Sequence, residues 1–345
     1  MAFEIEKCPS CGTNDWHKNG KDKGVQRVKC KECGYPTYLL MSGKLKRKPV
    51  VSGVTAKDKV QKDFVRDVLP ELKKIGKAAK AANKAEDNQT ITMPEGPFAI
   101  AMMSDVHGGA KADYEAIERD VNAVRDTEDM YAILAGDLTD NFIIGKLNAI
   151  QKDQHTVFSD EVLFIQWFIS NLRDSLIAFV SGNHDNWTKK LTARDHLKEL
   201  LGDAPALFDN HQVRFSLKQN GEVEKWLVRH KFKYSSVFNA THGMQVTWDR
   251  GEKPFDVVLG GHTHIASLCN EFLKHDKKRY AVLLGTYKLR DEFGLEHGFP
   301  KTHSATAGSG VFVYDGYGDK YWCDTIQKGQ KLLEYFKSSY HKKFE

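Results

Sequence analysis

Several short apolar runs in this 345-residue chain are followed at once by a cluster of Asp, Asn or His. The clearest is residues 176–180, Leu-Ile-Ala-Phe-Val, which leads into Ser-Gly-Asn-His-Asp at residues 181–185. A short continuous apolar run bounded by turn residues is typical of a buried strand. Open α/β sheets bind ligands beyond the carboxyl ends of their strands. The pattern therefore predicts an α/β fold whose functional site lies at one edge of a sheet.

The same arrangement recurs along the chain. Strands are predicted at 98–103, 131–135, 223–229 and 255–259, with further strands at 279–284 and 311–314. Helices are predicted at 113–125, within 153–173, and at 189–201. The polar clusters, in chain order, are Asp105 with His107; Asp137 with Asp140 and Asn141; Asn183 with His184 and Asp185; His230 alone; and His262 with His264.

Four of the six cysteines lie within the first 33 residues, where Cys8, Cys11, Cys30 and Cys33 form two C-x2-C pairs. Two such turns direct four thiolates to one position, which is the ligand set of a structural zinc site. A pair of disulfides is the alternative, and no secretion signal supports it. We expect zinc to stabilise a small domain at residues 1–42, because so few residues cannot bury a core.

This N-terminal segment resembles a zinc ribbon of the kind found at the front of transposases and other DNA-handling proteins. Residues 1–95 hold 20 Lys and Arg against 12 Asp and Glu, so the rest of the chain carries a net charge of −3. A basic part on a near-neutral body favours an anionic partner, and nucleic acid, DNA above RNA, is the expected one. A structural or protein-binding ribbon is the alternative. The basic residues expected to contact phosphates are Lys18, Lys21, Arg27 and Lys29.

Residues 43–96 are expected to form a basic linker that contains an amphipathic helix. Apolar residues recur at spacings of three and four between 55 and 83, and Pro70 is expected to kink or split that helix. The main domain is then predicted at 97–330, with a C-terminal tail at 331–345. The chain has no apolar run of membrane-spanning length and no signal-peptide core, so we expect a cytoplasmic protein.

The order and spacing of the five polar clusters resemble the calcineurin-like metallophosphoesterase superfamily, over roughly residues 97–315. The resemblance implies a two-sheet α/β sandwich flanked by helices and a metal-dependent phosphoric ester hydrolase. Two divalent metals about 3.5–4 Å apart clamp a phosphoryl group and activate a water for in-line attack. Manganese is the favoured metal, with iron, zinc, nickel and magnesium as alternatives.

Carried over motif by motif, the resemblance implies a role for each residue. Asp105, His107 and His264 would hold one metal; Asn183, His230 and His262 would hold the other; and Asp137 would bridge both. His184 would stabilise the transition state or protonate the leaving oxygen. Asp185 would orient His184 or cap a helix. For the fourth motif His242 is the rival of His230, which we prefer because it directly ends an apolar strand.

Departures from subfamily patterns narrow the substrate. Ser/Thr phosphatases of the superfamily continue their Gly-Asp motif with an Asp-Arg-Gly that grips phosphate, whereas Asp140 is followed here by Asn141 and Phe142. The Gly-Asn-His-Asp ending is closer to the exonuclease and phosphodiesterase branches. Residues 286–308 have the composition of a loop, with a plain surface loop preferred over a border of the site.

These observations favour a nuclease or phosphodiesterase that acts on nucleic acid and is recruited by the ribbon. A phosphomonoesterase or small-nucleotide phosphodiesterase with a protein-docking ribbon is one alternative. A non-catalytic DNA-binding module is the other, and the complete set of expected ligands argues against it. A phage origin would suit the ribbon.

Overall fold

The computed structural model falls into two compact units, residues 1–76 and 77–345, which are described separately. The structure describes residues 7–8, 10–22, 25–34, 36–38, 68–86, 89–109, 111–141, 158–234, 236, 238–249, 255–274, 276–289 and 308–341. Most of the predicted basic linker, residues 43–67, lies outside these ranges.

The first unit contains a three-stranded antiparallel sheet formed by β1 (Trp16–Asp22), β2 (Val25–Cys30) and β3 (Pro36–Tyr38). Val28 and Cys30 are buried on one face of β2, whereas Arg27 and Lys29 are exposed on the other. Helix α1 (Leu69–Glu86) crosses the boundary between the units. Pro70 lies in the first turn of α1, where a missing N–H costs nothing, and the part of the predicted helix before residue 68 lies outside the described ranges.

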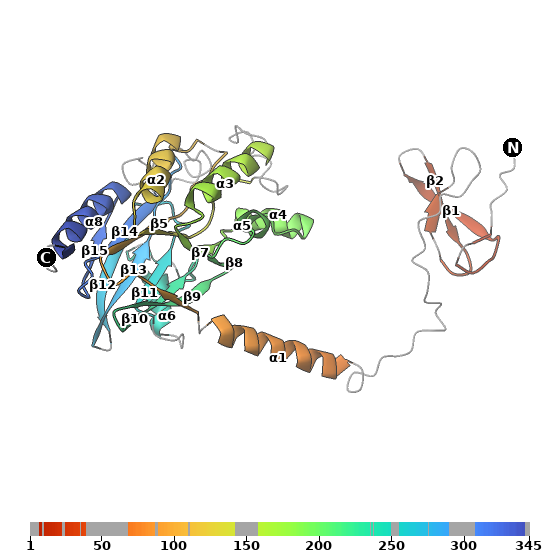
Figure 1. The fold of residues 1–345 in the computed structure, drawn as a ribbon. Coiled ribbons are helices and arrows are strands. Elements are labelled where there is room, and N and C mark those ends of the chain that lie inside the picture. The colour runs from red at the N-terminus through yellow and green to blue at the C-terminus, as the bar shows by residue number, and fades with distance from the viewer. Residues whose placement is uncertain are drawn as a thin grey trace. The chain divides into compact units, whose positions relative to one another are not determined.

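The second unit is a sandwich of two six-stranded sheets, shown in Figure 1. This confirms the predicted two-sheet α/β architecture. One sheet has the order β12-β13-β11-β10-β9-β4 and the other β15-β14-β5-β6-β7-β8. The strands of the first are β4 (Thr90–Thr92), β9 (Val213–Gln219), β10 (Glu222–Val228), β11 (Val257–Gly260), β12 (Leu268–Lys274) and β13 (Lys277–Leu283). Those of the second are β5 (Phe98–Met103), β6 (Met130–Leu134), β7 (Leu176–Val180), β8 (Leu207–Asp209), β14 (Ser309–Tyr314) and β15 (Lys320–Cys323).

The main apolar core fills the space between the two sheets. Phe98, Ile100 and Met102 of β5 point into it, and Trp226 and Val228 of β10 meet them from the other sheet. The alternate residues of β5 face outward and pack beneath helices. Those helices are α2 (Tyr114–Asp126), α3 (Phe158–Leu172), α5 (His196–Leu201) and α8 (Ile326–His341), while α6 (His242–Asp249) covers the other sheet.

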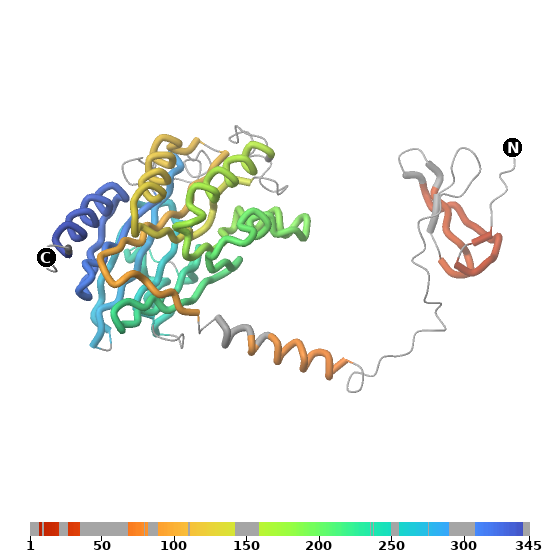
Figure 2. The backbone as a smooth tube through the Cα atoms, in the orientation of Figure 1, coloured from red at the N-terminus to blue at the C-terminus, as the bar shows by residue number. Residues whose placement is uncertain are grey.

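The strand directions bring the predicted site together. In the second sheet β5, β6 and β7 are parallel neighbours, and in the first β10 and β11 are parallel. Their carboxyl ends therefore lie at one edge of the sandwich, whose backbone Figure 2 traces in the orientation of Figure 1. Backbone hydrogen bonds continue past the strands, from Asp105 N to Gly136 O (2.9 Å) and from Gly261 N to His230 O (3.1 Å). All five polar clusters thus share one edge.

Two predicted limits of the main domain are wrong. Strand β4 lies before residue 97 and pairs with β9, so the sheet begins within the predicted linker. Helix α8 crosses the predicted boundary at 330, and its Leu333 is fully buried, with Leu332 and Phe336 packed against the same core, so the helix is packed onto the main domain. The predicted helix at 189–201 is two helices, α4 (Asp185–Thr192) and α5, separated at Ala193, which has a left-handed backbone. No helix in the described ranges is long and apolar enough to span a membrane.

The role of α8 can be tested by truncating a single side chain. Leu333→Ala should lower the free energy of unfolding by about 2–5 kcal/mol, because it leaves a cavity against the second sheet. The neighbouring exposed Glu334→Ala should change it by less than about 0.5 kcal/mol. Urea unfolding followed by circular dichroism measures both values. Equal stability of the two variants would mean that residues 331–341 contribute no more than the C-terminal tail that the sequence predicted.

Candidate metal centre

One group of predicted ligands gathers where β5 and β11 end. His264 Nε2 lies 2.9 Å from His107 Nε2 and 3.1 Å from Asp105 Oδ1, and the latter two atoms are 3.9 Å apart. Asp105 and His107 are fully buried. Three ligand atoms this close, one carboxylate and two imidazole, can share one divalent metal ion.

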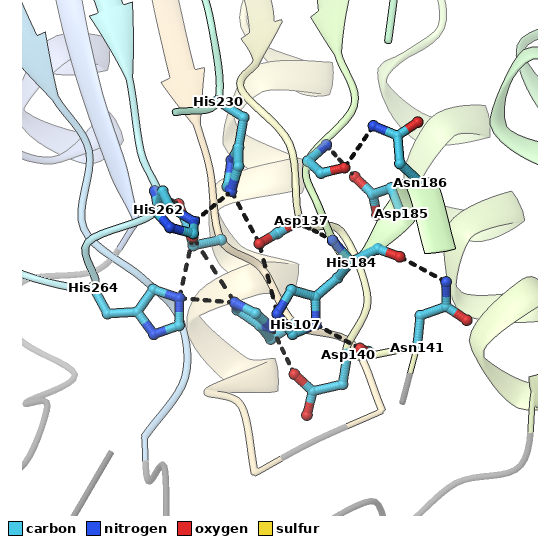
Figure 3. A network of polar contacts seen from close by, with 12 residues as sticks. His107, Asp137, Asp140, Asn141, His184, Asp185, Asn186, His230, His262 and His264 are labelled. Carbon is cyan, nitrogen blue, oxygen red and sulfur yellow. Dashed lines mark hydrogen bonds and ion pairs between the residues drawn. The ribbon is translucent and has the colours of Figure 1, made fainter. Parts of the chain in front are cut away.

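A second group lies beside the first, as Figure 3 shows. His230 Nε2 is 3.0 Å from Asp137 Oδ2 and 3.2 Å from His262 Nδ1. The structure therefore places His230 with these two residues, whereas its rival His242 is exposed at the start of α6 and belongs to no such group among the described residues. Asn183 follows β7 and borders the same groove as His230.

Two buried oxygen atoms show that the site suits cations. Asp105 Oδ1 and Asn183 Oδ1 are shielded from solvent, yet neither accepts a hydrogen bond. A buried acceptor without a partner costs about 1–3 kcal/mol, and more when it is charged. Both belong to the predicted ligand set, and oxygen together with imidazole is a donor set for Mn²⁺, Fe²⁺ or Zn²⁺. The residues present thus fit divalent metals.

Contacts behind the ligands fix their orientation. His230 Nδ1 donates to Ala135 O (2.7 Å), and His107 Nδ1 donates to Asp140 Oδ1 (2.6 Å). Each bond leaves Nε2 as the nitrogen that faces the site, which is how metal-binding histidines are usually held. Lys288 Nζ lies 3.2 Å from Asp140 Oδ1 and balances that buried carboxylate. Residues 286–288 are buried, so this part of the predicted surface loop borders the site after all.

The backbone at the site is strained. Asp105, His107, Asp137, His262 and His264 all have positive φ, between 50° and 74°. For residues other than glycine such a conformation costs roughly 1–3 kcal/mol, and it clusters at functional sites. Close packing accompanies it, because a Cβ on Gly182 would stand 1.9 Å from Asp137 Oδ1 and one on Gly261 would stand 2.2 Å from Asp105 Oδ2. Holding these side chains together therefore lowers the stability of the fold.

Comparison with known proteins identifies the domain. The family model for calcineurin-like phosphoesterases matches residues 98–266, which include every predicted ligand of the two divalent metals. Residues 98–266 are a calcineurin-like phosphoesterase domain. The chain therefore carries the domain of a metal-dependent phosphoesterase. Divalent metals bound here supply a Lewis acid for the phosphoryl oxygens and lower the pKa of bound water.

Solved structures show weaker similarity, and curated proteins show no match. A protein of unknown function from Aquifex aeolicus is 11% identical, with a TM-score of 0.27, over 48% of this chain and 80% of its own. GAP50, the anchor in the inner membrane complex of Plasmodium, is also 11% identical, with a TM-score of 0.32, over 63% and 81%. At these scores neither similarity says anything about activity.

His184, the predicted non-ligand histidine of the phosphoesterase domain, lies beside Asp137, the predicted bridging carboxylate. Its Nδ1 donates to Asp140 O (2.6 Å), and its Nε2 is 4.0 Å from Asp137 Oδ2. Burial lowers its pKa, although Asp137 acts in the opposite direction. The ring packs against Trp187 at a tilt of 35°, with centroids 4.1 Å apart. His184 is thus positioned at the site by its backbone partner and its aromatic neighbour.

Asp185 has neither of the roles considered from the sequence. Its carboxylate accepts hydrogen bonds from Leu138 N (3.0 Å) and Gly182 N (2.9 Å). It therefore ties the turn after β7 to the turn after β6. Burial and the nearby Asp137 raise the pKa of Asp185 to about 6. Sequence reasoning could not find this role, because the partner N–H groups belong to backbone that is brought close only by the fold.

The four predicted zinc ligands meet in the first unit. Cys8 Sγ is 3.6 Å from Cys33 Sγ, and Cys11 Sγ is 3.5 Å from Cys30 Sγ. Tetrahedral zinc with Zn–S bonds of about 2.3 Å requires sulfur atoms about 3.8 Å apart. All four cysteines are reduced, so the alternative of two disulfides finds no support. The geometry therefore suits a structural metal.

The predicted nucleic-acid contacts lie on the same small sheet. Lys18, Arg27 and Lys29 are exposed on β1 and β2, where Lys29 stands opposite His17. The side chain of Lys21 lies outside the part that the structure describes. Arg27 and Lys29 share one exposed face, which is compatible with phosphate contacts, whereas Lys18 pairs with Val28 and so lies on the other face.

The charges of the site predict that metal binding releases protons. Although burial opposes it, Asp140 raises the pKa of His107 to about 9, and Asp137 with Asp105 raises that of His230 to about 10. Burial, with the charges of His230 and Lys231, lowers the pKa of His262 to about 4. At pH 7.5 His107 and His230 are thus protonated in the metal-free protein, while His262 is neutral.

Metals bind only the deprotonated rings, so saturation at pH 7.5 should release up to two protons, and affinity should rise as the pH increases toward 9. Calorimetry of Mn²⁺ binding in buffers with different ionisation enthalpies measures this number. His230→Ala should remove about one of the released protons. Binding without proton release would contradict the assignment of these two histidines as ligands.

Proposed function

We propose that the protein is a nuclease or phosphodiesterase that hydrolyses nucleic acid, with the zinc ribbon as its recruitment module. The diester assignment rests on the residue that follows Asp140, which is Asn141. Asn141 is 1% exposed, and its Nδ2 donates to His184 O (2.7 Å) and Thr188 Oγ1 (2.9 Å). This side chain is used to hold the start of α4 and does not reach toward a phosphate.

The charge of the substrate explains why it matters that a neutral Asn141, and not an arginine, follows Asp140. A phosphomonoester carries about −1.5 to −2 at pH 7, whereas each phosphodiester carries one negative charge. An arginine after Asp140 would offer the extra cation that a monoester needs, and Asn141 offers none. The neutral residue supports the diester assignment over the phosphomonoesterase alternative.

A substrate panel tests this proposal. With Mn²⁺, the protein should cleave DNA or RNA and a chromogenic phosphodiester, and should act at least tenfold more slowly on the matching monoester. His184→Ala should retain both metals but lower turnover by roughly 10²–10⁴ if the ring acts as a general acid. Elemental analysis verifies the metal content. Preferred hydrolysis of the monoester would favour the phosphomonoesterase, and loss of metal in His184→Ala would make that residue a ligand.

Recruitment by the first unit is tested by deleting residues 1–67, which carry 15 Lys and Arg against 8 Asp and Glu. The deletion must end before α1 so that β4 keeps its pairing with β9. Nucleic-acid affinity should fall, and its dependence on salt should weaken by about 0.9 in logarithmic slope for each lost contact with duplex phosphate. Fluorescence anisotropy at several salt concentrations measures both.

Turnover of the small chromogenic diester serves as the control for the deletion and should survive, since the predicted catalytic ligands begin at Asp105. Charge reversal at Lys18, Lys21 and Arg27 should reproduce part of the loss. An unchanged affinity and an unchanged salt slope would rule out recruitment and leave protein docking as the role of the ribbon.

A further inference from the structure

A groove of about 510 Å³ opens directly beside the candidate metal centre. Two predicted metal ligands, Asn183 and His230, line it, so whatever occupies the groove lies next to the reacting phosphate. The other walls come from the turn after β7, from α4, from the turn between β8 and β9, and from Lys231, the residue after His230. The volume is in the range of ligand sites, roughly 300–1,000 Å³, and suits a nucleotide unit rather than a duplex.

The groove is positively charged, although residues 96–345 together are slightly acidic. Three lysines line it, and none of its lining residues is an Asp or Glu. Lys189 Nζ is engaged by Asp195 Oδ2 at 2.7 Å. Lys190 and Lys231 are exposed and make no ion pair with any residue in the described ranges. Two ammonium groups are therefore available to an anionic ligand at this wall.

The walls are fixed before any ligand binds. Asn186 Nδ2 donates to Gly182 O (2.8 Å) and Asn210 O (3.1 Å), while Asn210 Nδ2 donates to Asp195 Oδ2 (2.7 Å). These bonds connect α4 to the turn between β8 and β9. A preformed cleft with charges in place loses little freedom on binding. The shape of the groove is thus fixed by hydrogen bonds within the protein, as expected of a binding site.

Exposed aromatic side chains follow Lys231 in the chain. The Lys233 ammonium lies 5.2 Å from the centre of the Tyr234 ring, and Phe238 is completely exposed. Lysines interleaved with exposed aromatic rings are typical of surfaces that bind single-stranded nucleic acid, because the rings stack on unpaired bases. A duplex offers no unpaired bases to such rings.

We propose that this groove holds the backbone of a single-stranded nucleic acid next to the phosphate being cleaved, with Lys190 and Lys231 contacting its phosphates. The inference rests on the proposed function and narrows the substrate to single strands. It also separates selection of the substrate, which occurs in the groove, from recruitment by the ribbon.

The test uses the full-length protein and the double variant Lys190→Ala/Lys231→Ala. The matched control is Lys218→Ala/Lys277→Ala, which removes the same charge from exposed positions of β9 and β13 at the opposite end of the sheet. The probe for binding is a single-stranded oligodeoxynucleotide, measured by fluorescence anisotropy at several salt concentrations. The probe for catalysis is kcat/KM on that oligonucleotide divided by kcat/KM on a chromogenic diester.

The groove variant should lower the logarithmic salt slope by about 1.4, since each contact with a single strand contributes about 0.7. Its selectivity ratio should fall at least tenfold, whereas the control should match the wild type in both measurements. Wild-type protein should also prefer the single strand to a duplex of the same sequence.

The outcomes separate this inference from the proposed function. Cleavage of DNA by the wild type, together with equal slopes and equal ratios in the two double variants, would overturn the role of the groove and leave the nuclease assignment intact. A preference for duplex would also overturn it. Absence of nuclease activity in the wild type, with a chromogenic diester still hydrolysed, would overturn both.

Discussion

The site depends on two carboxylates, Asp105 and Asp137, that are buried together at the edge of the sandwich. A buried charge is tolerated only where cations and hydrogen bonds compensate it. Here Ser104 Oγ and His262 N donate to Asp105, His184 N donates to Asp137, and imidazoles surround both. One carboxylate oxygen, Asp105 Oδ1, is buried without a hydrogen bond, so the charge of Asp105 is only partly compensated. The strained turns, the close glycines and the parallel strand ends all serve to keep this negative charge in one place, where divalent metals complete the compensation.

The central features could be predicted from the sequence because they are local. An apolar run followed by Asp105 or Asn183 marks both a strand and its functional end, and parallel pairing then brings such ends together. Other features depend on contacts that only the fold creates. Lys288 lies in a segment without periodicity and is buried because Asp140, in the turn after β6, faces it. Helix α8 was missed because the apolar residues that it buries, such as Leu333, alternate with many polar ones. Strand β4 is three residues long and is held by β9.

The two units are stabilised by different interactions, and we propose a different task for each. The first buries little apolar surface, and its order centres on four cysteines within reach of one metal ion. The second is stabilised by an extended apolar core between two sheets and by helices outside them. In the proposed division of tasks, the basic ribbon would attract a polyanion at long range, whereas the groove beside the predicted metal ligands would select what is cleaved. Such a division would explain why a slightly acidic catalytic part still carries a basic wall at its site.

The central claim is that one edge of the sandwich binds two metal ions that Asp137 bridges. Anomalous diffraction from crystals grown with Mn²⁺ tests it most directly. The account predicts two peaks about 3.5–4 Å apart, one beside Asp105, His107 and His264 and the other beside Asn183, His230 and His262. A single peak at this edge, or a pair that does not share Asp137, would contradict the account.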